Sequence, residues 1–223
     1  MYKALMTKEW MKARRALIVC LCVALFFTIY ALLGINRVTA THGVEHIWLI
    51  MLMKDQAFID AIKYVPLLCG LIIGLAHMMP EMQLYRLKLT LHLPVPVSRL
   101  LLTMLGCGLL ELTLIFLIMA VAIACCYAPM ITGEMTTFVL LSTIPWFLAG
   151  YTAYLFAAAI CLEGRWKRRI LLALIAAALI CVYFFQPAPG AYNGFAPWAA
   201  IFTLLLVSLS FASVYRFKQG MID

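Results

Sequence analysis

Six long apolar runs, separated by short polar segments, dominate the pattern of this sequence. They cover residues 16–34, 61–79, 100–127, 137–161, 170–185 and 198–215. An α-helix rises about 1.5 Å per residue, so roughly 17–25 apolar residues cross the roughly 30 Å hydrocarbon core of a bilayer. The pattern therefore predicts an all-α membrane protein with six transmembrane helices.

The composition agrees with a membrane location. Of the 223 residues, 66% are hydrophobic and 12% are charged, whereas soluble domains are about 45–50% apolar and about 25% charged. The first run is too long for the apolar core of a signal peptide, so we expect it to remain in the protein as a span.

The basic residues predict the orientation. Of the 17 Lys and Arg, 14 fall on the side that holds both termini, and only Arg37, Lys54 and Lys63 fall on the other. Cytoplasmic segments of membrane proteins carry this excess, so both termini are expected in the cytoplasm. The net charge of +8 then reflects topology and attraction to anionic lipid heads, and it does not indicate a nucleic-acid partner.

All eight cysteines fall inside the apolar runs, where they cannot form the loop framework of a secreted disulfide-rich domain. We expect them to be small packing residues; a path for a soft metal ion is the alternative. They are Cys20, Cys22, Cys69, Cys107, Cys125, Cys126, Cys161 and Cys181.

Residues 1–15 are predicted to form an amphipathic helix at the membrane surface. The apolar face holds Tyr2, Met6, Trp10 and Ala13, and the basic face holds Lys8, Lys12 and Arg15. Such a helix rests among the lipid headgroups. The alternative is that this segment is only the basic flank that orients the first span.

The cytoplasmic segment between the second and third runs is predicted to contain a short helix over residues 81–92. Leu84, Leu87 and Leu91 have helical spacing, and Pro94 ends the helix. The alternation of leucines also fits a β-strand, but a lone strand in a segment of about 20 residues would have no pairing partner.

This region resembles the coupling-helix region of type-2 ABC transporter permeases. The residues that carry the resemblance are Glu81, Arg86, Lys88, Thr90, Leu91, Leu93, Pro94, Val97, Ser98 and Arg99, together with Lys8, Glu9 and Trp10 near the N-terminus. The segment 186–197 departs from the family, because it is shorter than the re-entrant helical pair of many such exporters.

The resemblance implies that this chain is one of two permease subunits in the cytoplasmic membrane of a bacterium. The two subunits would form a homodimer or a heterodimer. It implies partner ATPase subunits that hold ATP and Mg²⁺, and this chain has no phosphate-binding loop of its own, so it is not expected to be an enzyme or to bind a cofactor. The implied coupling residues are Glu81, Leu84, Arg86, Leu87, Lys88, Leu91, Pro94 and Arg99.

Three residues inside the apolar runs are candidates for a role in transport or in helix packing. Glu111 lies well inside the third run, where a charge is costly, so it should face protein or water. It is expected to serve either substrate passage or contact between subunits, or else to be a protonated or hydrogen-bonded structural residue. Gly70 and Gly74 have the small-x-x-x-small spacing of close helix packing; a role in motion during transport is the other interpretation.

Three other functions would leave different signals in the sequence. His42, Glu45 and His46 have the spacing of a zinc peptidase motif, but Gly43 and the lack of a further ligand pair lead us to predict no metal site. An ion-driven transporter would usually have more polar residues in its spans. An ABC complex that carries no cargo and pushes on an extracytoplasmic partner remains an alternative.

Overall fold

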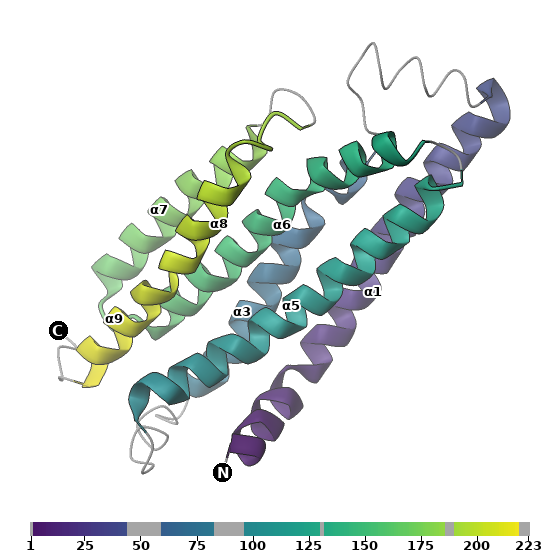
Figure 1. Cartoon of the computed structure of the whole chain (residues 1–223). Coiled ribbons are helices and arrows are strands. Elements are labelled where there is room, and N and C mark those ends of the chain that lie inside the picture. Colours follow the sequence, from purple (N-terminus) through teal and green to yellow (C-terminus); the bar gives the residue numbers. More distant parts are fainter. Residues whose placement is uncertain (1, 44–58, 83–95, 130–131, 186–189, 219–223) are drawn as a thin grey trace.

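The protein is described by a computed structural model over residues 2–43, 59–82, 96–129, 132–185 and 190–218. Every regular element in these segments is a helix (Figure 1). They are α1 (Tyr2–His42), the 3-10 helix η1 (Asp60–Ile62), α3 (Val65–Met82), α5 (Val97–Tyr127), α6 (Gly133–Leu162), α7 (Trp166–Phe184), α8 (Ala196–Leu205) and α9 (Val207–Lys218). The predicted all-α class is thus confirmed for the described segments.

Several helical segments are long and apolar enough to cross a bilayer. Among the described residues there are five, namely Leu5–Thr41, Asp60–Met82, Val97–Tyr127, Gly133–Leu162 and Ala196–Arg216. The fifth apolar run corresponds to α7, whose first turn contains the basic residues Lys167, Arg168 and Arg169. This helix is not among the five. A multi-pass membrane protein is therefore supported, and the sixth span stays a prediction.

The ends of the chain differ from the expected boundaries. The predicted surface helix 1–15 and the first span form one continuous helix, α1, since no Pro or Gly occurs before Gly34 to interrupt it. The last run is instead divided at Leu206, whose N–H is shared between the carbonyl oxygens of Phe202 and Thr203. This tightened turn separates α8 from α9.

Helix α6 lies between two groups of helices, with α1, α3 and α5 on one side and α7, α8 and α9 on the other (Figure 1). Small residues allow its close approach to α3. A Cβ on Gly70 would collide with the carbonyl oxygen of Gly150, and one on Gly74 would lie 2.8 Å from the Cβ of Ala157. Both predicted packing glycines therefore lie where the two helices meet.

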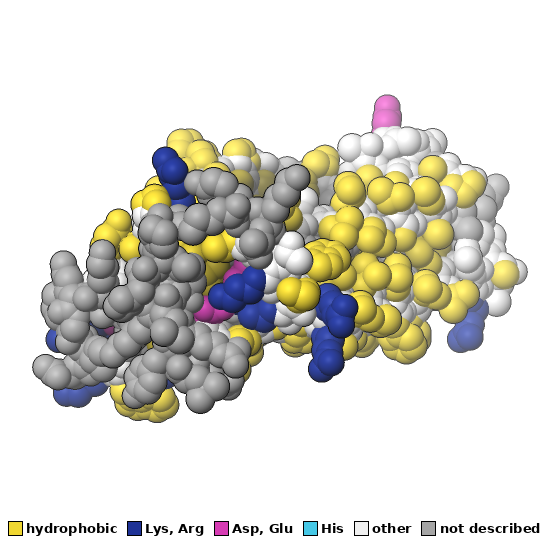
Figure 2. Space-filling view, turned by 90° about the horizontal axis from the view of Figure 1, so that it is seen from below, with side chains coloured by type: hydrophobic (Ala, Val, Ile, Leu, Met, Phe, Trp, Pro, Cys, Tyr) yellow, Lys and Arg dark blue, Asp and Glu magenta, His cyan; other side chains and the backbone are white. Residues whose placement is uncertain are grey.

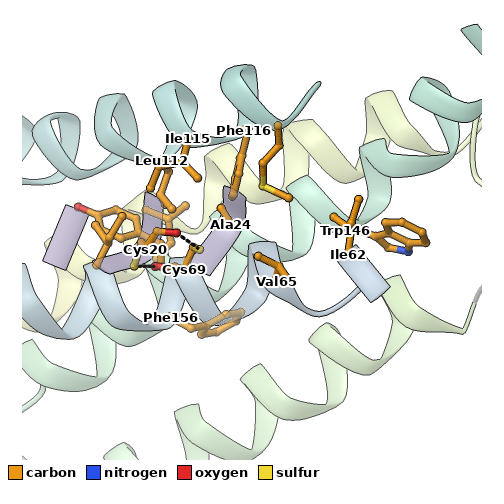
Figure 3. Packing of buried hydrophobic residues seen from close by; sticks show 14 of the residues in the cluster. Cys20, Ala24, Ile62, Val65, Cys69, Leu112, Ile115, Phe116, Trp146 and Phe156 are labelled. Atoms are coloured by element: carbon orange, nitrogen blue, oxygen red, sulfur yellow. Dashed lines mark hydrogen bonds between the residues drawn. The ribbon is translucent and has the colours of Figure 1, made fainter. Parts of the chain in front are cut away.

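The buried centre of the bundle is apolar. Cys20 of α1 and Cys69 of α3 face each other there, and each thiol donates to the other residue's carbonyl oxygen, with S···O distances of 4.0 and 3.7 Å (Figure 3). Ala24, Leu112 and Phe116 pack in the same cluster. These two cysteines act as packing residues, whereas Cys22, Cys125 and Cys181 are exposed on the outside of the bundle.

The outer surface of the bundle is also apolar. Phe26, Leu117, Leu174 and Leu204 are each at least 60% exposed, and hydrophobic side chains cover much of the face seen in Figure 2. In water such a surface would aggregate, whereas in a bilayer it contacts lipid. The start of α1 and the end of α9 lie at the same end of the bundle (Figure 1).

Candidate functional site: a buried charged cluster between α1, α3 and α5

A cluster of six ionisable side chains lies inside the bundle. It consists of Lys8, Glu9 and Lys12 from α1, His77 and Glu81 from α3, and Glu111 from α5. Glu9, His77, Glu81 and Glu111 are each at most 4% exposed. Ionisable residues are rarely buried to this extent unless they are paired, so this charged cluster is the leading candidate for a functional site.

His77 connects three helices at the centre of the charged cluster. Its Nδ1 lies 3.3 Å from Oε2 of Glu9 on α1, and its Nε2 lies 3.2 Å from Oε2 of Glu111 on α5. The histidine is completely buried. A single imidazole therefore holds α1 and α5 to α3.

The lysines complete the charged cluster on the side of α1. Lys12 lies 2.6 Å from Glu9 and 3.2 Å from Glu81, and Lys8 lies 2.9 Å from Glu81. Positions 8 and 12 on α1, like positions 77 and 81 on α3, are four residues apart, so each pair lies on one face of its helix. Two adjacent turns of each helix thus meet along this contact.

The geometry around His77 requires one additional proton. Both ring nitrogens face carboxylate oxygens, and each contact needs a proton to be a hydrogen bond. A neutral imidazole carries only one. The second proton must therefore be on the ring or on one of the two glutamates. With it on the ring, His77, Lys8 and Lys12 balance the three carboxylates, which reduces the cost of their burial.

One carboxylate oxygen of the charged cluster is not hydrogen-bonded within the described residues. Oε1 of Glu111 is buried and has no hydrogen-bond partner within the described part of the chain. Glu111 also lines a cavity of about 480 Å³ between α1 and α5. The other lining residues are Met6, Thr7, Trp10, Cys107, Leu110 and Leu114.

The charged cluster lies near the end of the bundle that holds the termini. Glu111 is 14 residues, or about 21 Å, along α5, which by itself suggests a deep position. Its partner His77, however, is only five residues, or about 8 Å, from the end of α3. In Figure 2, which views the molecule from below, acidic and basic side chains lie next to one another at the surface.

The predicted site residues are only partly brought together. Glu81 and Glu111 both belong to the charged cluster, whereas Arg99 lies on the first turn of α5 and is exposed. The remaining coupling residues lie outside the described residues; they are Leu84, Arg86, Leu87, Lys88, Leu91 and Pro94.

The structure describes only one of the three residues of the candidate zinc motif. Glu45 and His46 lie outside the described residues, and His42 is the last residue of α1. Within the described ranges, no group of three or more His, Cys, Asp or Glu side chains could hold a metal ion.

Sequence reasoning missed His77, and it placed Lys12 on the basic face of a helix that lies at the membrane surface. In the structure the side chain of Lys12 is only 12% exposed. A signal was present, because His77 is the only Asp, Glu, Lys, Arg or His between Lys63 and Glu81, and it lies four residues before Glu81. An ionisable residue in an apolar run is by itself a reason to look for a buried partner.

A second polar contact joins the helices of the other group. The carboxylate of Glu163, at the end of α6, accepts hydrogen bonds from Ser213 at 2.9 Å and from Arg216 at 3.1 Å, both on α9. Its carbonyl oxygen accepts from Arg169 on α7. This contact fastens the ends of three helices together.

Comparison with known proteins adds no relative. No family model matches the chain, no curated protein matches its sequence, and no solved structure matches its fold. The resemblance to type-2 ABC permeases therefore rests on sequence alone, namely on the motif between Glu81 and Arg99 and on Lys8, Glu9 and Trp10.

Proposed function

We propose that the chain is the permease subunit of an ABC exporter in a bacterial cytoplasmic membrane. A separate ATPase, with ATP and Mg²⁺, would supply the energy, and a second permease subunit would complete the pathway. In this proposal α7 is the sixth span, since its 19 residues extend about 28 Å. With six crossings both termini lie on one side, in keeping with their position at one end of the bundle (Figure 1).

The observation that carries the proposal is the attachment of Glu81. This residue precedes the segment 83–95, which contains most of the proposed coupling helix, and it pairs with Lys8 and Lys12 of α1. Through Glu9 and His77 the same contacts reach α5. A displacement of residues 83–95 by an ATPase would therefore pull on α1, α3 and α5 together, because buried ion pairs resist separation.

The test is directed at the coupling helix. Replacing Leu87 and Leu91 together by Ser removes its proposed apolar anchor, because interface energy concentrates in a few desolvated side chains. We expect the variant to insert normally but to lose a copurifying P-loop ATPase, or to lose the effect of the permease on ATP hydrolysis. The milder control is Arg86→Ala, whose effect should depend on salt, since charges at an interface rim mainly steer association.

Retention of the ATPase at wild-type stoichiometry and activity in the double Ser variant would remove this helix as the coupling element. The cargo-free alternative predicts the same ATPase but no response of hydrolysis to any small ligand. The cavity beside Glu111 favours the version with a cargo, because a pure force transmitter needs no ligand-sized space.

A further inference from the structure

Basic side chains outnumber acidic ones at the end of the bundle where α6, α7 and α9 meet. Residues 163–169 and 213–216 contain four arginines and one lysine but only one carboxylate, that of Glu163. This carboxylate is paired with Arg216, and Arg169 is bound to the carbonyl oxygen of Glu163. The described part of this end therefore carries an excess of positive charge, unlike the charged cluster between α1, α3 and α5.

Arg165 and Arg168 have no carboxylate partner among the described residues. Nε of Arg165 and Nη1 of Arg168 are buried there without a hydrogen-bond acceptor, and they are closed to any ligand. Both residues are only half-buried, however, and their other guanidinium nitrogens are neither buried in this way nor hydrogen-bonded to a described residue. Because the charge of a guanidinium is delocalised, an anion at these open nitrogens balances the charge of the whole group.

The first turn of α7 makes the excess of positive charge more costly. It contains Lys167, Arg168 and Arg169 and no acidic residue, and the side chain of the N-cap residue Arg165 makes no capping hydrogen bond. The N-terminus of a helix carries a partial positive charge, so basic residues there are unfavourable and a nearby anion is favourable. The sequence of this turn therefore opposes the helix dipole unless an anion lies beside it.

The surface next to these arginines is apolar. On α7, Trp166 is 69% exposed, Ile170 48% and Leu171 57%, and on α9 Tyr215 is 48% exposed. A soluble anion gains nothing from such a surface, whereas the acyl chains of a lipid pack against it. Arginine and aromatic side chains at the end of a span also lie at the depth of the lipid headgroups. The charge and the surface together indicate an anionic phospholipid.

We infer that Arg165 and Arg168, with the first turn of α7, bind the phosphate group of one anionic phospholipid, whose acyl chains lie along the outer surface of α7. Basic flanks attract anionic lipids in general, whereas here two particular guanidinium groups hold one headgroup, since a guanidinium binds phosphate through two parallel hydrogen bonds. The inference rests on the proposed placement of α7 in the membrane. It needs neither an ATPase nor a second permease subunit, so it is tested on the purified chain alone.

The probes are phosphatidylglycerol and phosphatidylcholine, each with a photoreactive diazirine on an acyl chain close to the glycerol. Each probe is added at the same fraction to phosphatidylcholine nanodiscs that contain the full chain. Cross-linking is measured by mass spectrometry at Trp166 and Ile170 of α7. The reference positions are Trp198 and Ile201 of α8, which are 68% and 52% exposed and lie in a stretch, residues 170–215, without any Lys or Arg.

The measured quantity is the preference for phosphatidylglycerol over phosphatidylcholine at α7, divided by the same preference at α8. In roughly 1 M NaCl, where the Debye length is about 3 Å, we expect this ratio to be roughly 5- to 30-fold, about 5-fold for each arginine. Arg168→Gln should lower it about 5-fold. The control Lys167→Gln removes the same charge from the adjacent, exposed residue and should lower it less than about 2-fold. Arg168→Lys keeps the charge but not the planar group, so its ratio should fall between the two.

A ratio near one in the wild-type protein would overturn the inference. Equal losses in Arg168→Gln and Lys167→Gln would do so as well, because a diffuse attraction does not distinguish two adjacent charges. Loss of the preference on addition of soluble glycerol phosphate would assign the arginines to a soluble anion and would also overturn it. If Arg168→Gln does not fold, Arg165→Gln takes its place in the comparison. Strong cross-linking of α7 by both lipids without a preference leaves the proposed sixth span in place, so the two failures are distinguishable.

Discussion

Lys8 and Lys12 provide a direct test of the charged cluster. Both lie on α1, four residues apart, and both pair with Glu81. They differ in burial, since the side chain of Lys8 is 45% exposed and that of Lys12 is 12% exposed. Lys12 also contacts Glu9 at 2.6 Å. Replacing each by Met keeps most of the side-chain length and removes only the charge.

The expected magnitudes differ because burial differs. Lys12→Met leaves Glu9 and Glu81 short of their compensating charge inside the bundle, and the loss of one partner from a buried ion pair costs about 3–5 kcal/mol. Lys8→Met removes a pair that water reaches on one side, for which about 0–1 kcal/mol is typical. The free energy of unfolding should therefore fall several-fold further in Lys12→Met.

The measurement is thermal unfolding of the detergent-solubilised protein followed by tryptophan fluorescence, since Trp146 is buried. The double variant Lys12→Met with Glu9→Gln removes one charge of each sign and should recover part of the lost stability, as contacting residues are not additive. Equal midpoints for Lys8→Met and Lys12→Met, or no recovery in the double variant, would refute the ion-paired arrangement.

Two further predictions concern packing and topology. Gly70→Ala should destabilise the protein by about 1–3 kcal/mol, because α3 and α6 must separate to admit the new methyl group. The control Gly106→Ala should be neutral or stabilising, because no atom lies within 4 Å of the added Cβ. Equal unfolding midpoints for the two variants would contradict the close packing of α3 and α6. In a cysteine-free background, Trp166→Cys should react with an impermeant thiol reagent only from the cytoplasm and Asn193→Cys only from outside, and the reverse pattern would contradict the six-span topology.

The helices and their apolar character were predictable because both depend on local sequence. Runs of apolar residues long enough for a bilayer predict helices wherever they occur, since a backbone in lipid must satisfy its own hydrogen bonds. The need for a partner at Glu111 followed from the same energetics. The boundaries were less predictable: α1 continues through residue 15 because nothing interrupts it, and the turn at Leu206 has no Pro or Gly beside it in the sequence.

The site was decided by tertiary structure alone. Glu9 and Glu111 lie 68 and 34 residues from His77 along the chain, and no periodicity within one helix shows which faces of three helices will meet. That choice depends on how α1, α3 and α5 pack against one another. The sequence predicts helices that cross a membrane and a buried partner for Glu111, whereas the packing of α1, α3 and α5 determines that this partner is His77.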